Sequence, residues 1–166
     1  MFDSELQTVA EILDEAAAFI DAVICWDPGV IRLCRARGIA VHISTQASVA
    51  NTEAAVFYRE LGAERVILAR ECSLEEIRRV REGGGIAVEV FVHGAMCVSV
   101  SGRCFLSQLT AGKSANRGEC LQHCRRQYRV VDPSAPEHEL MLGNNYILSA
   151  RDLCALPFLE KVVETG

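Results

Sequence analysis

Four of the eight cysteines in this chain lie within residues 92–124 and are the first candidates for chemistry. Cys97, Cys104, Cys120 and Cys124 are separated by six, fifteen and three residues, and Cys154 follows thirty positions later. The acidic, amphipathic first residues are unlike a secretory signal peptide, so we expect a cytoplasmic protein. In that reducing compartment, clustered thiols bind metals or do chemistry more often than they form disulfides. The cluster therefore predicts a metal or iron–sulfur site.

The spacing favours an iron–sulfur cluster over zinc. No two of these cysteines form the C-x2-C pair of a zinc ribbon, so zinc is the weaker alternative. The four thiolates that hold a cluster need only converge in space, and a glycine precedes several of these cysteines closely enough to let the backbone bend around a cofactor. Redox or catalytic thiols remain open as a third explanation. Cys25 and Cys34, by contrast, read as small buried hydrophobic residues.

Basic residues gather around the same cysteines, although the chain has a net charge of −5. Between positions 103 and 129 a single acid, Glu119, accompanies the basic residues Arg103, Lys113, Arg117, Arg125, Arg126 and Arg129. Such an island beside thiols suits an anionic substrate or RNA, whereas a solvated face that balances nearby acids explains the charge equally well. We predict substrate contacts from Arg103, Lys113, Arg117, Arg125 and Arg126.

The elements that must position these residues alternate regularly through the first part of the chain. Four helices are expected: one opened by a Ser4–Gln7 capping box, then 27–38, 52–61, and 73 to the glycines at 83–85. Short apolar runs at 22–26, 39–43, 66–69 and 87–92 separate them, and the first of these suits a strand buried on both faces. This alternation predicts an α/β fold of parallel βα units.

Polar residues follow each predicted strand, at the edge where parallel sheets carry their sites. These strand ends are Trp26–Asp27, residues 44–46, Arg70–Glu71 and His93–Gly94. Any one of them alone would more often be a helix cap, so only the four strand ends together indicate a shared site. We predict that Gln46, Arg70, Glu71 and His93 line a catalytic pocket.

The predicted organisation has three parts within one domain. Residues 1–93 form the βα units, residues 94–128 form a cysteine-rich loop module, and residues 129–166 close the same domain. In the closing part we expect a strand at 127–132, a loop marked by Pro133 and Pro136, and a helix that begins near Asp152. No apolar run approaches the roughly 20 residues of a membrane span.

The cysteine-rich segment also resembles a known family. "EVFVHGAMCVSVSGRCFLSQLTAGKSANRGECLQHCRRQY" is similar to the motif of peptidase family U32, the collagenase-like proteins, and the likeness extends to "WDPGVIRL", "HISTQASVAN", "LGAERVILARECSLEEI" and "SARDLC". The resemblance implies a TIM-type barrel. It also implies relatives that are oxygen-independent or prephenate-linked hydroxylases of tRNA, ribosomal RNA and the ubiquinone ring. These relatives carry a [4Fe–4S] cluster, whose ligands would match Cys97, Cys104, Cys120 and Cys154, with Cys124 able to replace Cys154.

These expectations lead to a first hypothesis of an iron–sulfur hydroxylase that acts on RNA or on a small aromatic quinone precursor, with prephenate as a possible co-substrate. A thiol or metal-dependent peptidase, built on His93 and Cys97, is one alternative. A truncated module that only binds a partner is the other. Four strands cannot close an eight-stranded barrel, so we expect a fragment of a longer protein, or else a second chain that supplies the missing N-terminal half.

Overall fold

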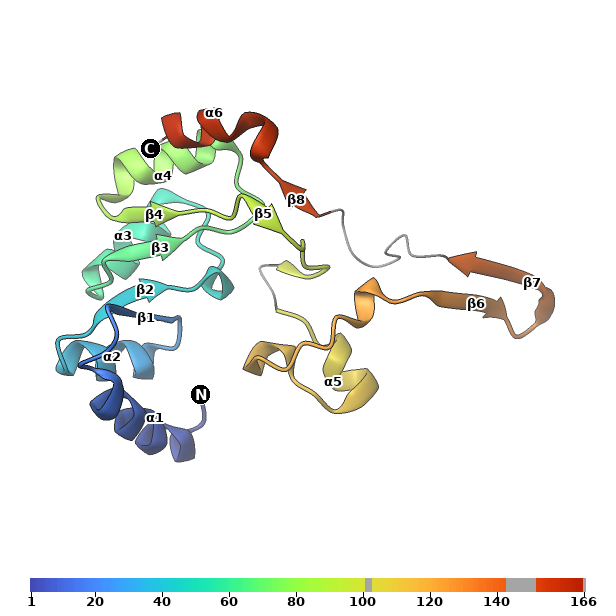
Figure 1. The fold of residues 1–166 in the computed structure, drawn as a ribbon, viewed down its shortest axis with the longest axis horizontal. Helices are drawn as coiled ribbons and strands as arrows, with labels where there is room; N and C mark the ends of the chain where they lie inside the picture. The colour runs from blue at the N-terminus through green and yellow to red at the C-terminus, as the bar shows by residue number, and fades with distance from the viewer. Residues whose placement is uncertain (101–102, 143–151, 166) are drawn as a thin grey trace. The chain divides into compact units, whose positions relative to one another are not determined.

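The computed structural model describes residues 1–100, 103–142 and 152–165, and it divides into two compact units. The βα unit comprises Met1–Val92 and Ala155–Gly166, and the cysteine unit comprises His93–Cys154 (Figure 1). The predicted boundary after residue 93 lies one position from this division. Residues 129–154, however, group with the cysteine-rich segment, and only the C-terminal residues group with the βα unit.

The βα unit contains a four-stranded parallel sheet with the order β1-β2-β3-β4. Its strands are β1 (Ala22–Cys25), β2 (Ala40–Ile43), β3 (Arg65–Ile67) and β4 (Ala87–Glu89). Its helices are α1 (Asp3–Ala16), α2 (Pro28–Ala36), α3 (Thr52–Glu60), α4 (Leu74–Gly84) and α6 (Leu159–Glu164), with 3₁₀ turns at Thr45–Ala47 and Leu156–Phe158. The predicted α/β fold with a parallel sheet is confirmed. Closure into a TIM-type barrel stays a prediction.

Three of the helix starts follow the predicted caps. Asp27 Oδ1 accepts hydrogen bonds from the amides of Gly29 and Val30 at 2.9 and 3.2 Å, which begins α2. Asn51 Oδ1 accepts from Ala54 N at 2.9 Å and begins α3. Ser73 and Glu76 form a reciprocal capping box at the start of α4. These local hydrogen bonds satisfy amides that have no partner within the helix, which is why the sequence locates them well.

The predicted capping box between Ser4 and Gln7 is wrong. Helix α1 begins two residues earlier than that box predicts, at Asp3, with Phe2 as its N-cap. The Glu5 carboxylate accepts a hydrogen bond from Phe2 N at 2.8 Å, so an acid at the third helical position satisfies the end of the helix.

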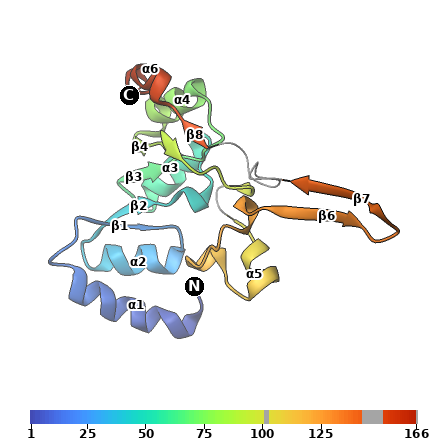
Figure 2. The same ribbon diagram turned by 45° about the vertical axis from the view of Figure 1, so that its right-hand side comes forward.

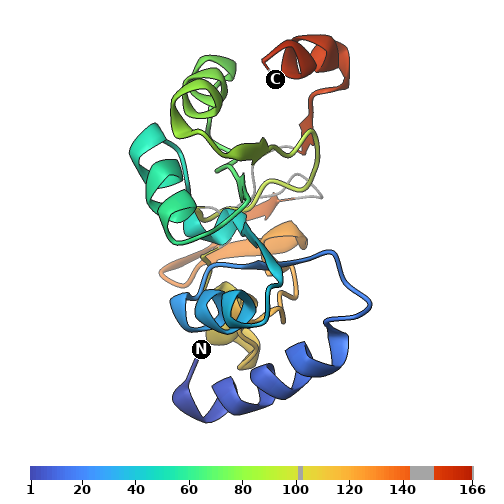
Figure 3. The same ribbon diagram turned by 90° about the vertical axis from the view of Figure 1, so that its left-hand side faces the viewer.

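Helices α2, α3 and α4 cover one face of the sheet (Figure 3). The inward side chains of the strands, such as Val41, Ile43 and Val66, are buried in an apolar core between sheet and helices. On the opposite face Ile24 is 60% exposed and lies beside His42 on the neighbouring strand. The prediction that residues 22–26 are buried on both faces is therefore wrong for this structure, because the described helices cover one side only.

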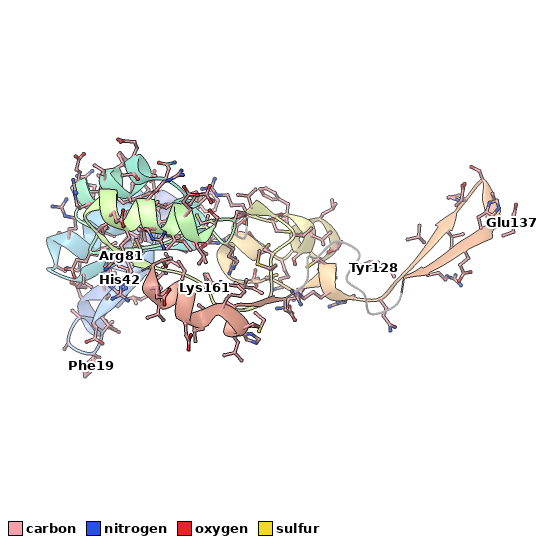
Figure 4. All side chains as sticks on the ribbon, turned by 90° about the horizontal axis from the view of Figure 1, so that it is seen from above. Phe19, His42, Arg81, Tyr128, Glu137 and Lys161 are labelled. Atoms are coloured by element: carbon pink, nitrogen blue, oxygen red, sulfur yellow. The ribbon has the colours of Figure 1, made fainter. Side chains whose placement is uncertain are left out.

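The cysteine unit consists of short elements. They are β5 (His93–Gly94), α5 (Leu106–Ala111), β6 (Tyr128–Asp132), β7 (Ala135–Leu142), β8 (Leu153–Cys154), and 3₁₀ turns at Ala115–Arg117 and His123–Arg125. Strand β5 pairs with β8, and β6 pairs with β7, both antiparallel. The β6–β7 hairpin extends away from the other elements of its unit (Figures 1 and 2). In Figure 4, Tyr128 marks its base and Glu137 lies near its tip.

Two predictions for the closing part need correction. The strand expected at 127–132 is present as β6, but Pro136 lies inside β7 rather than in a loop. A two-stranded hairpin has only edge strands, and these tolerate a residue without an amide hydrogen. The helix expected near Asp152 is absent there. Residues 153–154 form β8 instead, and α6 begins only at Leu159, after the 3₁₀ turn that contains Pro157.

Within residues 1–100, 103–142 and 152–165, no helix is long and apolar enough to cross a membrane.

Candidate metal centre

Cys124 lies near the other three thiols of the first cysteine group within the cysteine unit. Burial raises the pKa of the Cys124 thiol, and the neighbouring thiols of Cys120, Cys97 and Cys104 raise it further, whereas the Arg125 guanidinium lowers it. Such electrostatic coupling requires that the side chains lie near one another. Residues spread over 28 positions of sequence are thus gathered around Cys124.

Two of these sulfurs already accept hydrogen bonds from the backbone. The amide of Ser99 donates to Cys97 Sγ at 3.4 Å, and the amide of Leu106 donates to Cys104 Sγ at 3.3 Å. Each donor lies two residues after its cysteine, so each loop bends back toward its own sulfur. Amide donors of this kind would tune the potential of an iron–sulfur centre that these sulfurs held.

The thiols do not converge on a single point. Among the described residues, no three His, Cys, Asp or Glu side chains lie closely enough together to coordinate one ion. The choice between an iron–sulfur cluster and zinc therefore stays a prediction.

His123 adds a buried polar atom beside the thiols. Its Nε2 atom is buried and has no hydrogen-bond partner in the described part of the chain. The His123 carbonyl is held from the other side, because Tyr128 Oη donates to it at 2.5 Å. A buried nitrogen without a partner is costly unless a bound group satisfies it, so this position also fits an occupied site.

Cys154 is positioned by strand pairing. It lies on β8 directly opposite His93 on β5, and both residues are exposed. Among the cysteines, sequence reasoning placed only Cys97 near His93, which it also predicted to line a catalytic pocket. The structure adds a second thiol next to this histidine, which no local pattern could reveal because 61 positions separate the two residues. The choice of Cys154 or Cys124 as fourth ligand stays a prediction.

Arg125 lies inside the cysteine unit, unlike the other basic residues predicted to bind substrate. Its side chain is only 13% exposed and forms an ion pair with Asp152 at 2.7 Å. It also donates to the carbonyl of Met96 at 3.4 Å. These internal contacts could not be read from charge alone, since Asp152 is far away in sequence.

The other predicted substrate contacts are on the surface of the same unit. Arg103, Lys113, Arg117 and Arg126 are all exposed. Lys113 forms an ion pair with Glu119 at 2.9 Å, the one acid of the basic island. Their exposure is compatible with contacts to an anionic partner and equally with a solvated surface.

Gln46, Arg70 and Glu71 belong to the βα unit, whereas His93 belongs to the cysteine unit. Gln46 is in the 3₁₀ turn after β2, and Arg70 and Glu71 follow β3, as predicted for carboxyl ends of strands. The Arg70 guanidinium stacks over the Phe91 ring at 4.1 Å, which holds it beyond the ends of β3 and β4. A shared pocket of all four residues stays a prediction.

Sequence reasoning missed Asn116. Its Oδ1 atom accepts a hydrogen bond from the Cys104 amide at 3.1 Å and so links the loop of Cys104 to the turn just before Cys120. The signal available was the motif "NRGEC", in which the asparagine stands four residues before a cysteine.

The remaining cysteines are structural in their placement. Cys34 is fully buried in the core of the βα unit, and Cys25 and Cys72 pack against that core. Burial, together with Cys34 and Asp27, raises the pKa of Cys25 to about 12. Burial likewise raises the pKa of Cys72, with Glu76 and Glu71 adding to the effect.

Comparison with solved structures supports the fold. The chain is similar to the U32 peptidase Mk0906, with a TM-score of 0.54 and 18% identity over 86% of this chain and 57% of that one. At this level of identity the likeness concerns the fold alone.

The sequence relatives are named either as proteases or as RNA hydroxylation proteins. The chain is 40% identical to the uncharacterized protease MJ0090 of Methanocaldococcus jannaschii, over 99% of this chain and 42% of the relative. It is 36% identical to a collagenase of Porphyromonas gingivalis, over 100% and 42%. It is 38% identical to tRNA hydroxylation protein P1 of Bacillus subtilis, over 90% and 36%. The chain thus spans less than half the length of these relatives.

The family itself is settled by the extent of the match. The model of peptidase family U32 covers residues 1–166, which includes both the parallel sheet and the cysteine unit. The chain belongs to peptidase family U32.

Proposed function

We propose that this chain is the cluster-bearing part of an iron–sulfur-dependent hydroxylase that acts on RNA. The observation that carries the proposal is the gathering of Cys97, Cys104 and Cys120 around Cys124, in a unit whose described residues include no fully buried hydrophobic side chain. Small modules without a core commonly depend on a metal or on disulfides for their fold. The name of the B. subtilis relative, a tRNA hydroxylation protein, favours RNA as the substrate class.

The protein's own residues would bind and tune the cofactor. Three thiolates, from Cys97, Cys104 and Cys120, would hold it together with Cys124 or Cys154. The amides of Ser99 and Leu106 would adjust its potential through their hydrogen bonds to sulfur. When bound, a [4Fe–4S] cluster supplies one-electron redox chemistry that no side chain offers.

The exposed basic residues would contact the RNA backbone. Arg103, Lys113, Arg117 and Arg126 lie on the same unit as the thiols, and cations of this kind bind phosphates without reading sequence. A ubiquinone precursor as substrate and prephenate as co-substrate, both implied by the family resemblance, remain predictions.

Metal analysis of the anaerobically reconstituted chain tests the proposal. We expect about four irons and four sulfides per chain, with a broad absorption in the visible range. A colourless protein that holds one zinc ion would refute it. Because the relatives are longer, hydroxylation itself should be assayed in the whole protein, by mass spectrometry of nucleosides from RNA of cells that carry or lack it.

A peptidase is the second candidate, and the pairing of His93 with Cys154 favours it. A thiol with an imidazole on the adjacent strand is a possible nucleophile and base. This candidate predicts gelatin cleavage by the whole protein that Cys154→Ser abolishes. Cleavage that survives the substitution, or that is absent from pure protein, would exclude it.

A further inference from the structure

We infer that Arg125 is a positioning residue, which braces the backbone segments that carry the predicted cluster ligands. The inference rests on the proposed function, because bracing matters only if those thiols must meet one cofactor. It gives Arg125 a role different from the substrate contact that its charge suggests.

The Arg125 guanidinium contacts two other segments of the cysteine unit. Arg125 Nη1 lies 2.7 Å from Asp152 Oδ1, and Arg125 Nη2 donates to Met96 O at 3.4 Å. Both contacts are within the cysteine unit, and each uses a different nitrogen of the same planar group. A guanidinium can make two directed contacts at once, which the single ammonium of a lysine does poorly.

Arg125 and its two partners each lie within two residues of a candidate ligand in the sequence. Met96 immediately precedes Cys97, Arg125 immediately follows Cys124, and Asp152 lies two residues before Cys154. One side chain therefore connects three segments, each of which carries a candidate ligand. The brace serves the site whether Cys124 or Cys154 provides the fourth thiolate.

Apolar burial does little to hold these segments, two of which the short β5–β8 pairing also joins. In the described part of the cysteine unit no hydrophobic residue is fully buried, and Ser107 is the one buried polar residue. Burial of the Arg125 side chain strengthens its ion pair relative to a surface pair and also makes the loss of one partner costly. Polar contacts of this kind, placed just outside metal ligands, typically change metal affinity about 10- to 100-fold when removed.

Retention of the cluster tests this inference in the reconstituted chain. We would compare Arg125→Gln, Asp152→Asn, the double variant and the reversed pair Arg125→Asp/Asp152→Arg, and follow loss of the visible absorption under an iron chelator. We expect loss about 10-fold faster in each single variant, no further loss in the double variant, and partial rescue by the reversed pair. Equal stability of all variants, or additive losses in the double variant, would overturn the inference.

Arg129→Gln is the matched control. Arg129 is also an ion-paired arginine of the cysteine unit, but its partner is Glu139 on the β6–β7 hairpin, at 3.7 Å, and the side chain is exposed. We expect the control to retain its cluster as the unaltered chain does. Faster loss in this variant would show that any lost charge weakens the site, and this result would also overturn the inference.

A second measurement separates this inference from the proposed function. In the metal-free chain, hydrogen exchange at residues 94–97 and 152–154 should be faster in Arg125→Gln than in the unaltered protein and unchanged in Arg129→Gln. If the chain takes up no iron but this difference appears, the proposed function fails while the brace stands. If the chain takes up iron and exchange is the same in all variants, the brace fails and the proposed function stands.

Discussion

The βα unit and the cysteine unit are stabilised by different means. In the βα unit, residues from four strands and their helices bury an apolar core that includes Ile31, Ile43 and Val66. In the cysteine unit, apolar side chains such as Leu109 are as much as 85% exposed, and the described contacts are polar. Ion pairs, amide–sulfur hydrogen bonds and the Asn116–Cys104 link hold its loops together.

This difference decides what each unit needs in order to stay folded. Burial of apolar area stabilises the βα unit without any ligand. The described residues of the cysteine unit gain little from burial, so under the proposed function the cluster would supply much of the free energy that orders this unit. The proposed cluster would therefore serve as both the redox centre and the structural core of that unit.

The largest expected effect is the loss of one predicted ligand. Cys104→Ser should abolish the visible absorption and most of the bound iron, and hydrogen exchange throughout the cysteine unit should rise. The amides of β2 and β3 should keep their protection, because their core is elsewhere. Loss of protection in both units would show that they are not separately stabilised.

A contrast in thiol reactivity is expected to be nearly as large. In the metal-free chain the Cys120 thiol is exposed to reagents. The Cys25 thiol is partly buried and has a pKa of about 12, so at about pH 8 only roughly one Cys25 side chain in ten thousand is a reactive thiolate. Alkylation followed by peptide mass spectrometry should therefore modify Cys120 far faster than Cys25. Both should react alike in denaturant, and similar rates in the folded chain would contradict the assignment of Cys25 to the core region.

A substitution in the apolar core tests how the βα unit is stabilised. Ile43→Ala removes a fully buried side chain and should lower the free energy of unfolding by about 2–5 kcal/mol. Iron content after reconstitution should not change. The matched control is Ile12→Ala on α1, an exposed isoleucine whose replacement should alter stability by less than about 0.5 kcal/mol. Equal effects of the two substitutions in urea unfolding would count against the described core.

A smaller effect is expected at a helix cap. Asn51→Ala removes the acceptor for the Ala54 amide and should destabilise the βα unit by about 1 kcal/mol. Asn51→Asp supplies the same acceptor and should restore most of the loss. If urea unfolding finds the two variants equally destabilised, the cap contributes through something other than this hydrogen bond.

The smallest effect is a pH dependence that arises at the start of α4. Hydrogen bonds from Ser73 lower the pKa of Glu76 below its ordinary value of 4.5. Because the folded value is the lower one, this group contributes stability above the ordinary pKa and loses it as the pH falls through the folded value. As the pH is lowered from about 6 to about 3, the melting temperature should therefore fall less steeply for Glu76→Gln than for the unaltered chain. Parallel curves would contradict this contribution.

Much of the βα unit could be predicted because its signals are local. Asp27, Asn51 and Ser73 act on amides two or three residues away, so the sequence alone locates the helices that they begin. Apart from the Ser4–Gln7 capping box, the failures are tertiary. Residues 153–154 became a strand because they pair with His93–Gly94, a partner that lies far away in sequence, and Pro136 was accommodated by an edge strand.

The candidate site divides in the same way. The types and spacing of the cysteines were enough to predict a shared metal centre, which stays a prediction, since clustered thiols commonly bind metals. Charge alone grouped Arg125 with the surface arginines, because sequence does not say which cation is buried and paired.

By itself the sequence determined the alternation of strands and helices, their caps, and the presence of many thiols in one region. Hydrogen bonds over a few residues and periodic burial encode these features directly. Only the tertiary structure decided which thiols lie together, that His93 stands opposite Cys154, and that Arg125 turns inward to Asp152. Each of these depends on contacts between segments far apart in the chain, whose free energy exists only once both are in place.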